Sequence, residues 1–405
     1  MALSRYDSMK WFALISLYIV QGLPHGFFGQ AMPVLLREQG VDLKSIGLMS
    51  LVALPWALKF IWAPLLDRVA LVPNEYRRSW ILAMNHTAVL FLIGLSFVPL
   101  PWLTSDGVLL LALALMAINF FTATQDIATD ATAVENLKPS ERGSGNGIQV
   151  GGYRIGMVMA GGILLSYFNY LGWQHALWSL AALMLLGSLP LYFWKPRPHS
   201  KANEDVWRQW SGFFRLDNPW LWVALIAFYK FGDAFGTQMI RPYLSDMGIT
   251  LEQMGPLLGV GGFIAGLSGA VFGGWLTGKL QRGQALILFL LLETAAMLGY
   301  TLADAQNMVS VWCAVIAEHL AGGMATAALF TVMMDRCREH SEGADYAFQS
   351  CLIIISGMVA MSLSGYSATN LGYAGHFSLA AVLCASAIVF VLAAQRRGLF
   401  LINGK

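Results

Sequence analysis

The sequence predicts an all-α membrane protein that crosses the bilayer twelve times, in two pseudo-symmetric six-helix bundles. Of its 405 residues, 57% are hydrophobic and only 12% are charged, a composition too apolar for a soluble domain. Twelve apolar segments reach the length of about 20 residues with which a helix crosses the hydrocarbon core. They cover approximately residues 11–34, 46–66, 80–100, 107–132, 147–168, 175–194, 219–243, 254–276, 285–303, 310–333, 346–368 and 376–394.

The distribution of basic residues predicts the orientation in the membrane. Of the 25 Lys and Arg residues, 19 fall on the side that holds both termini and two, Arg37 and Lys44, fall on the other. Because basic loops stay in the cytoplasm, both termini are predicted to be cytoplasmic. The basic residues form no patch and the net charge is only +2, so no nucleic-acid partner is expected. The remaining four basic residues lie inside predicted spans: Lys59, Arg154, Lys230 and Arg241.

Signals for enzymes, metals and nucleotides are weak in this sequence. The first apolar run is longer than a signal-peptide core and is predicted to be an uncleaved helix. The glycine-rich residues 143–147 do not follow a strand and lack a Walker lysine. We therefore predict no enzyme, no metal and no cofactor apart from a coupling proton. The four cysteines lack metal or redox spacing and are expected to be packing residues: Cys313, Cys337, Cys351 and Cys384.

The chain divides into two similar halves. Residues 195–218 form the longest polar interval and are predicted to be a central cytoplasmic loop, between a bundle at 1–194 and a second bundle with a short basic tail at 219–405. The pattern Gly40-x-x-Leu43-x-x-x-Gly47 recurs as Gly248-x-x-Leu251-x-x-x-Gly255. At the same offset, His25, Phe27 and Gln30 match Asp233, Phe235 and Gln238. Such a parallel repeat is typical of secondary transporters that rock two bundles around a midplane site.

The short loop after the second span carries a candidate gate. Asp67 and Arg68 follow this span, and Lys279 and Arg282 occupy the corresponding region of the second half, which lacks the acid. These two stretches resemble degenerate copies of the cytoplasmic loop signature of the major facilitator superfamily, and the resemblance implies that the residues latch neighbouring helix ends. A helix C-terminus also favours nearby basic residues. Simple anchoring by positive charge on the cytoplasmic side remains the alternative.

Four stretches in order carry a family resemblance: QGLP at 21–24, LPWALKFIWAPLLDR at 54–68, ATQDIATDA at 123–131 and GYRIG at 152–156. Together they resemble the AmpG-like branch of the major facilitator superfamily. That branch includes the muropeptide permeases AmpG, the eukaryotic acetyl-CoA transporters and the siderophore permeases RhtX and FptX. The resemblance implies the superfamily fold, with the two bundles working by alternating access.

The member type is predicted from length and from the first span. AmpG proteins usually carry two further C-terminal spans, and with twelve spans this chain looks more like the RhtX and FptX type. The resemblance then implies a monomeric symporter of the bacterial inner membrane that imports an iron-siderophore into the cytoplasm. Import of a peptidoglycan fragment by an AmpG-type muropeptide permease is the alternative. A membrane sensor or assembly protein on the same fold is a third possibility, against which the charges inside the spans argue.

Charges inside apolar spans mark the candidate transport site, because they are costly in a bilayer. Lys59, Asp126 and Arg154 are predicted at one depth in the first half, where they would line the cavity or merely hold helices together. Asp130 lies one turn from Asp126 and could instead cap a helix or meet Arg142. The candidates for proton coupling are Asp126, Asp130, His25 and Asp233.

The substrate is predicted to fill a cavity between spans one, four, seven and ten. Histidine titrates near neutral pH, so His25 could carry the coupling proton, whereas Asp233 could simply pair with Lys230 three residues earlier. Glu293 is left out of the site because the ninth span is peripheral in the superfamily. The candidates for substrate contact are Gln21, Gln30, Lys59, Tyr153, Arg154, Lys230, Gln238, Arg241, Glu318 and His319.

Overall fold

The protein is helical throughout the part of the chain that the structure describes. The computed structural model describes residues 2–41, 49–196, 205–304 and 306–400. Leu43, Lys44 and Gly47 lie outside these residues, as do 197–204 of the predicted central loop and 401–405 of the predicted tail. The chain divides into two compact units.

Unit 1 comprises Met1–Asn136, Gly152–Trp210 and Arg338–Phe348, and unit 2 comprises Leu137–Gly151, Ser211–Cys337 and Gln349–Lys405. Each unit therefore includes one short segment from the other half of the sequence. The division predicted from the sequence, 1–194, 195–218 and 219–405, stays a prediction.

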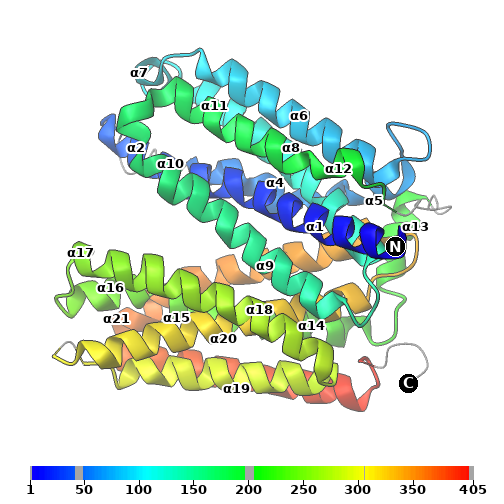
Figure 1. Ribbon diagram of the computed structural model, residues 1–405. Helices are drawn as coiled ribbons and strands as arrows, with labels where there is room; N and C mark the ends of the chain where they lie inside the picture. The colour runs from blue at the N-terminus through cyan, green and yellow to red at the C-terminus, as the bar shows by residue number, and fades with distance from the viewer. Residues whose placement is uncertain (1, 42–48, 197–204, 305, 401–405) are drawn as a thin grey trace. The chain divides into compact units, whose positions relative to one another are not determined.

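The first half of the chain forms helices that follow its apolar segments (Figure 1). They are α1 (Ala2–Gly26), η1 (Phe27–Ala31), α2 (Met32–Glu38), η2 (Ser50–Ala53), α4 (Leu54–Leu58), η3 (Lys59–Ile61), α5 (Ala63–Arg68), α6 (Tyr76–Ser96), α7 (Leu100–Leu103), α8 (Val108–Asn136), α9 (Arg142–Val158), η4 (Met159–Ile163), α10 (Leu164–Ser166), α11 (Phe168–Ser188) and α12 (Pro190–Phe193).

The helices of the second half also follow its apolar segments. Its helices are α13 (Val206–Phe213), α14 (Pro219–Tyr229), α15 (Phe231–Thr237), α16 (Ile240–Asp246), α17 (Leu251–Met254), η5 (Gly255–Gly262), α18 (Phe263–Lys279), α19 (Arg282–Thr301), α20 (Met308–Asp335) and α21 (Glu342–Arg396). Within unit 1, α6 packs against α8 and α11, and within unit 2, α20 packs between α18 and α19. Each unit buries its own apolar core.

Nine helical stretches within the described residues are long and apolar enough to cross a membrane. The longest, α21, has 55 residues and contains Gly372 with a φ of 68°, where the chain turns back and two spans meet. The remaining two predicted spans, 46–66 and 219–243, are built from short helices in series. Taken together, these stretches account for the predicted twelve spans.

Proline explains why the span at 46–66 is broken. Pro55 and Pro64 lack the N–H that continues a helix, and each stands near the start of a new helical piece. A backbone group freed in this way needs another partner within a membrane. The indole N–H of Trp210 donates at 3.2 Å to the Phe60 carbonyl, which has no N–H of Pro64 to bind, and Arg77 donates at 3.2 Å to the Leu66 carbonyl in the last turn of α5. Side chains from elsewhere in unit 1 therefore satisfy one carbonyl freed by proline and one at a helix end.

The internal repeat extends to the backbone of the turns. Gly40 and Gly248, which start the repeated pattern, have φ values of 81° and 80°. Gly172 and Gly372 have φ values of 70° and 68°. Only glycine adopts these left-handed conformations without strain. The two halves thus make the same turns at corresponding places.

Candidate functional site

The broken second span places a lysine against an aspartate of the fourth span in unit 1. Lys59 begins η3, directly after α4 ends, and its ammonium group forms an ion pair with Asp126 of α8. The two side chains are only 4% and 7% exposed. The Lys59 ammonium also lies over the Trp56 ring, 5.5 Å from its centre, a favourable cation–π arrangement. The structure therefore brings together two residues that the sequence placed at one depth.

Asp130 and Tyr18 extend this cluster. Asp130 lies one turn further along α8 and is 3% exposed. The phenol of Tyr18, on α1, is within electrostatic range of both Asp126 and Asp130. Arg142, the partner suggested for Asp130 as an alternative, binds Asp335 at 2.9 Å in unit 2. Two acids, a lysine and a phenol are thus gathered in the interior of unit 1.

Indole hydrogen bonds fix the second span to the fourth. The Trp56 N–H donates to the side-chain oxygen of Asn119 at 2.9 Å, and the Trp62 N–H donates to the Thr124 hydroxyl at 3.0 Å. Asn119 was not among the predicted site residues, although a polar amide in the middle of an apolar run was a usable signal. These bonds hold Lys59 opposite Asp126.

The other candidates of unit 1 differ in their exposure. His25 and Gln30 are exposed, and Tyr153 and Arg154 are half-buried. The rings of His25 and Tyr153 lie 5.5 Å apart. Gln21 is only 2% exposed. The membership of Arg154 in the cluster of Lys59 and Asp126 stays a prediction, as does the pairing of His25 with Asp233 of the other unit.

Unit 2 holds a second charged cluster, again at a helix break. Lys230 separates α14 from α15. Its ammonium group lies 2.8 Å from Asp233 and forms a second ion pair with Glu293 of α19. Glu318 of α20 is close by: a Cβ built on Gly322 would meet the carboxylate oxygens of Asp233 and Glu318 at 3.5 and 3.7 Å and the Lys230 ammonium at 3.8 Å. Lys230, Asp233 and Glu318, three of the predicted residues, therefore converge.

Glu293 belongs to this cluster although the sequence-based prediction left it out. Its side chain is 1% exposed and bonded to Lys230. The reasoning from a peripheral ninth span did not anticipate this contact, which arises because α19 packs against α15 and Glu293 is buried beside Lys230. An acid in the centre of an apolar run was the signal that could have identified it.

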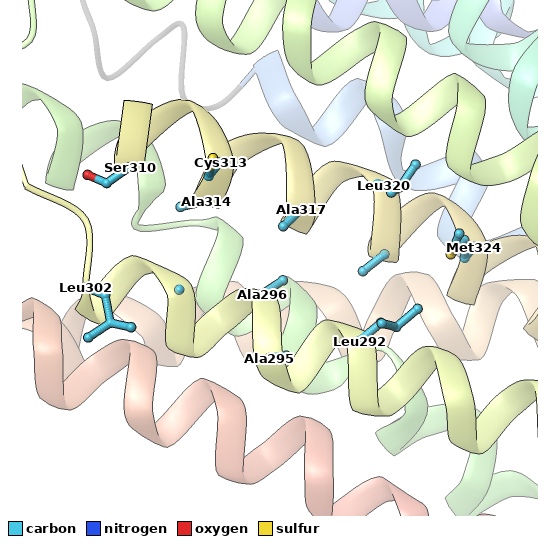
Figure 2. Close-up of a pocket in the computed structure, with 12 residues that line it drawn as sticks. Leu292, Ala295, Ala296, Leu302, Ser310, Cys313, Ala314, Ala317, Leu320 and Met324 are labelled. Carbon is cyan, nitrogen blue, oxygen red and sulfur yellow. The ribbon is translucent and has the colours of Figure 1, made fainter. Parts of the chain in front are cut away.

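The remaining candidates of unit 2 are exposed or half-buried. His319 is half-buried and contacts Glu318, whereas Gln238 and Arg241 are exposed. A separate cavity of about 440 Å³ runs between α19 and α20 (Figure 2). Its lining is apolar, with side chains such as Leu292, Ala317 and Met324, and no charged residue of the described chain lines it. This cavity is therefore distinct from the charged cluster.

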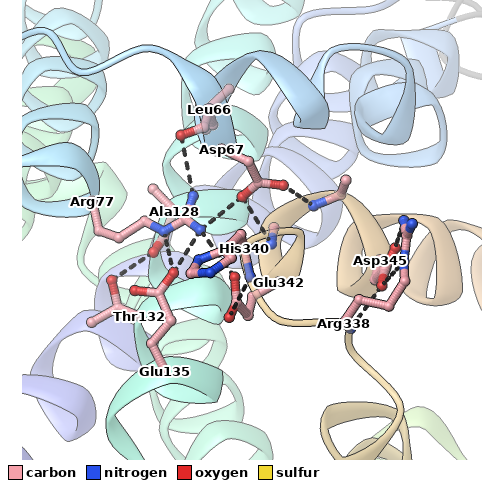
Figure 3. Close-up of polar contacts among 12 residues, drawn as sticks. Leu66, Asp67, Arg77, Ala128, Thr132, Glu135, Arg338, His340, Glu342 and Asp345 are labelled. Atoms are coloured by element: carbon pink, nitrogen blue, oxygen red, sulfur yellow. Dashed lines mark hydrogen bonds and ion pairs between the residues drawn. The ribbon is translucent and has the colours of Figure 1, made fainter. Parts of the chain in front are cut away.

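The candidate gate residue Asp67 caps the first turn of a distant helix. Asp67 is fully buried and accepts hydrogen bonds from the backbone N–H groups of Gly343 and Ala344, at 3.1 and 2.8 Å, in the first turn of α21 (Figure 3). A carboxylate is favoured there by the free N–H groups and the helix dipole. Arg77 lies 2.7 Å from Asp67 and also binds Glu135. Asp67 thus ties a segment of the second half of the sequence to unit 1.

Unit 2 has a related ion network without the capping acid. Arg282 binds Asp335 at 2.7 Å and the carbonyl oxygens of Thr277 and Pro139 at 2.6 and 2.8 Å. Lys279 is exposed, and Arg68 is half-buried. The structure therefore brings Asp67 and Arg282 into ion networks of their own units, while the gating role of all four residues remains a prediction.

Comparison with known proteins identifies the family to which this fold belongs. The family model for the Major Facilitator Superfamily matches residues 14–352. The anhydromuropeptide permease of Escherichia coli K12 is 30% identical over 95% of this chain and 79% of its own length. A putative transporter AmpG 1 from Rickettsia bellii is 24% identical over 96% of this chain and 98% of its own length.

Solved structures show the same fold at low identity. An outward-facing structure of the transporter FucP matches with a TM-score of 0.72 and 14% identity, over 95% of this chain and 98% of that one. A bacterial homologue of the iron transporter ferroportin, in an outward-facing state, matches with a TM-score of 0.69 and 15% identity, over 96% of this chain and 99% of that one. This chain belongs to the major facilitator superfamily, in its AmpG-like branch, and is a multi-pass membrane transporter, not an enzyme.

Proposed function

We propose that this transporter imports anhydromuropeptides across the bacterial inner membrane, driven by protons. The observation that carries the proposal is the similarity to the E. coli anhydromuropeptide permease, which extends over 95% of this chain. The relatives described above bear muropeptide or AmpG names, and they support the muropeptide alternative better than the siderophore expected from chain length.

The chemistry of the candidate residues suits such a substrate. An anhydromuropeptide joins sugars to a short peptide and so presents hydroxyls, amides and carboxylates. Gln30 and Gln238 are exposed amides that can donate and accept hydrogen bonds, and Arg241 is an exposed guanidinium that can bind a carboxylate in bidentate fashion. Lys59 is engaged with Asp126, so we assign it to the coupling machinery and not to direct substrate binding.

Uphill import without an ATPase needs a coupled ion. Both units bury carboxylates against a lysine at a helix break, and such intramembrane acids are the usual elements of proton relays. In the proposed cycle a carboxylate takes up a proton from the periplasm, substrate binds, and the proton and the substrate leave on the cytoplasmic side. We also propose that both termini of the chain lie on the cytoplasmic side.

Transport into membrane vesicles tests the substrate. The chain is expressed in a strain that lacks its own muropeptide permease, and right-side-out vesicles receive labelled anhydromuropeptide with a pH gradient, acid outside. We expect accumulation above that of vesicles with empty vector, and loss of accumulation when the gradient is collapsed. A labelled ferric siderophore serves as the second substrate. Accumulation of the siderophore instead of the anhydromuropeptide would overturn the proposal.

A further inference from the structure

The charged cluster of unit 2 contains more acids than permanent cations. Lys230 is shared by Asp233 and Glu293, and Glu318 lies beside the same point. The other titratable groups that face the cluster within the described structure are His319, the phenols of Tyr229 and Tyr300, and the Cys384 thiol. The phenols and the thiol are neutral near pH 7. One lysine therefore faces three carboxyl groups.

Burial makes the excess of carboxyl groups over lysine in this cluster energetically costly. Like charges that share a buried site cannot all remain ionised, and a buried charge without a partner is strongly disfavoured. Asp233 Oδ1, Glu293 Oε2 and Glu318 Oε2 are buried and have no hydrogen-bond partner among the described residues, although Glu318 Oε2 contacts the His319 ring. Oxygens of this cluster are thus open to a further ligand that neutralises negative charge.

Glu293 is the most deeply buried of the three carboxyl groups. Its side chain is 1% exposed, against 15% for Asp233 and 7% for Glu318. Glu318 has His319 as a neighbour, and Asp233 keeps an ion pair with Lys230 at 2.8 Å. Protonation of Glu293 would therefore leave Lys230 and Asp233 as a neutral pair.

We propose that Glu293 carries the coupling proton. We further propose that Lys230 transmits the protonation of Glu293 to the broken seventh span. In the proton-loaded state Glu293 Oε2 carries the proton, and the Lys230 ammonium, which keeps its charge throughout, pairs with Asp233 alone. Release of the proton to water on the cytoplasmic side restores the Glu293 carboxylate, which then competes for Lys230. Because Lys230 lies between α14 and α15, a change of partner moves the junction of these two helices.

The first measurement detects the proton itself and needs no substrate. Infrared difference spectra of the purified protein should show the C=O band of a protonated carboxyl group, and Glu293→Gln should lose it. The control Glu252→Gln, which changes an exposed acid of the same unit, should keep the band. A band that persists in E293Q would overturn the assignment.

The second measurement concerns transport and rests on the proposed function. E293Q should no longer accumulate anhydromuropeptide under a pH gradient, yet should still exchange labelled for unlabelled substrate, because exchange needs no net proton movement. Gradient-driven accumulation by E293Q would overturn the inference. If the wild-type protein moved no anhydromuropeptide, the proposed function would fail while the infrared result would still decide where the proton lies.

A conservative variant keeps the inference testable when E293Q does not fold, as judged by size-exclusion chromatography. Glu293→Asp retains a carboxyl group with a shorter side chain, so the infrared band should remain but shift in frequency. An unshifted band in E293D would place the proton on another residue and contradict the inference.

Discussion

At the scale of single residues, variants of the buried pair of Lys59 and Asp126 can distinguish a structural role of this pair from a role in transport. Asp126→Asn would leave a lysine charge buried without its carboxylate, and breaking such a pair costs about 3–5 kcal/mol. We expect a clear fall in the thermal midpoint of the detergent-solubilised protein, together with loss of uptake.

The double variant Lys59→Met with Asp126→Leu is the matched control. Replacing a buried ion pair by apolar side chains of similar size is often neutral or stabilising, so the thermal midpoint should recover. Uptake should stay lost, because the coupling machinery is gone. Recovery of both stability and uptake would show that the pair only holds helices together.

A second residue-scale prediction concerns the cap on α21. Gly343 and Ala344 donate to different oxygens of Asp67, so Asp67→Asn keeps an acceptor for only one of these N–H groups and removes the charge that also faces Arg77. Hydrogen bonds to charged groups contribute about 1.5–3 kcal/mol, and we expect a loss of this size in the free energy of unfolding. Lys279→Gln, at an exposed position, should change it by less than about 0.5 kcal/mol. Equal effects of the two variants would contradict the cap.

Sequence reasoning found the charged residues but not all of their partners. Lys59 and Asp126 could be matched because the rise of a helix fixes their depth in the membrane. The partnership of Lys230 with Glu293 could not, because it depends on which face of α19 turns inward, and an almost uniformly apolar helix gives little periodic signal. The candidate gate residue Asp67 could be identified only as one of a group of charges, since two of its contacts are to backbone N–H groups of α21.

At the scale of helices, alanine substitution of two adjacent glycines of α20 should have different effects on the thermal midpoint. A Cβ on Gly323 would overlap the carbonyl oxygen of Gly266 and lie 2.9 Å from the Ala270 nitrogen, on α18. Such overpacking against backbone costs about 1–3 kcal/mol. Gly323→Ala should therefore lower the thermal midpoint, whereas Gly322→Ala meets its neighbours no closer than 3.5 Å and should leave it nearly unchanged. A larger loss for G322A would contradict the described crossing of α18 and α20.

Most helices could be predicted from hydrophobic length alone, but only one of the two interruptions at a lysine left a local signal in the sequence. The spans at 46–66 and 219–243 read as continuous apolar runs, whereas the structure breaks them at Lys59 and Lys230. Proline marked the first break. The second falls at a residue whose charge is held by Asp233 and Glu293, so it depends on tertiary contacts that no local pattern records.

At the scale of the whole molecule, composition and the internal repeat predicted a twelve-span transporter, and the family comparison and matching folds confirm that class. The substrate could not be predicted in the same way. Glutamine, arginine and tyrosine side chains bind many polar molecules, and chain length pointed to a siderophore while the sequence relatives favour a muropeptide. Substrate identity depends on the shape of a binding site, which residue types alone do not define.

Simultaneous measurement of substrate and proton movement tests the central claim most directly. Purified protein is reconstituted into vesicles without an imposed gradient, labelled anhydromuropeptide is added outside, and a pH electrode follows the external medium. We predict that substrate entry raises the external pH in wild-type vesicles, and that E293Q exchanges substrate without this change. Entry of anhydromuropeptide with no movement of protons in the wild-type protein would contradict the account.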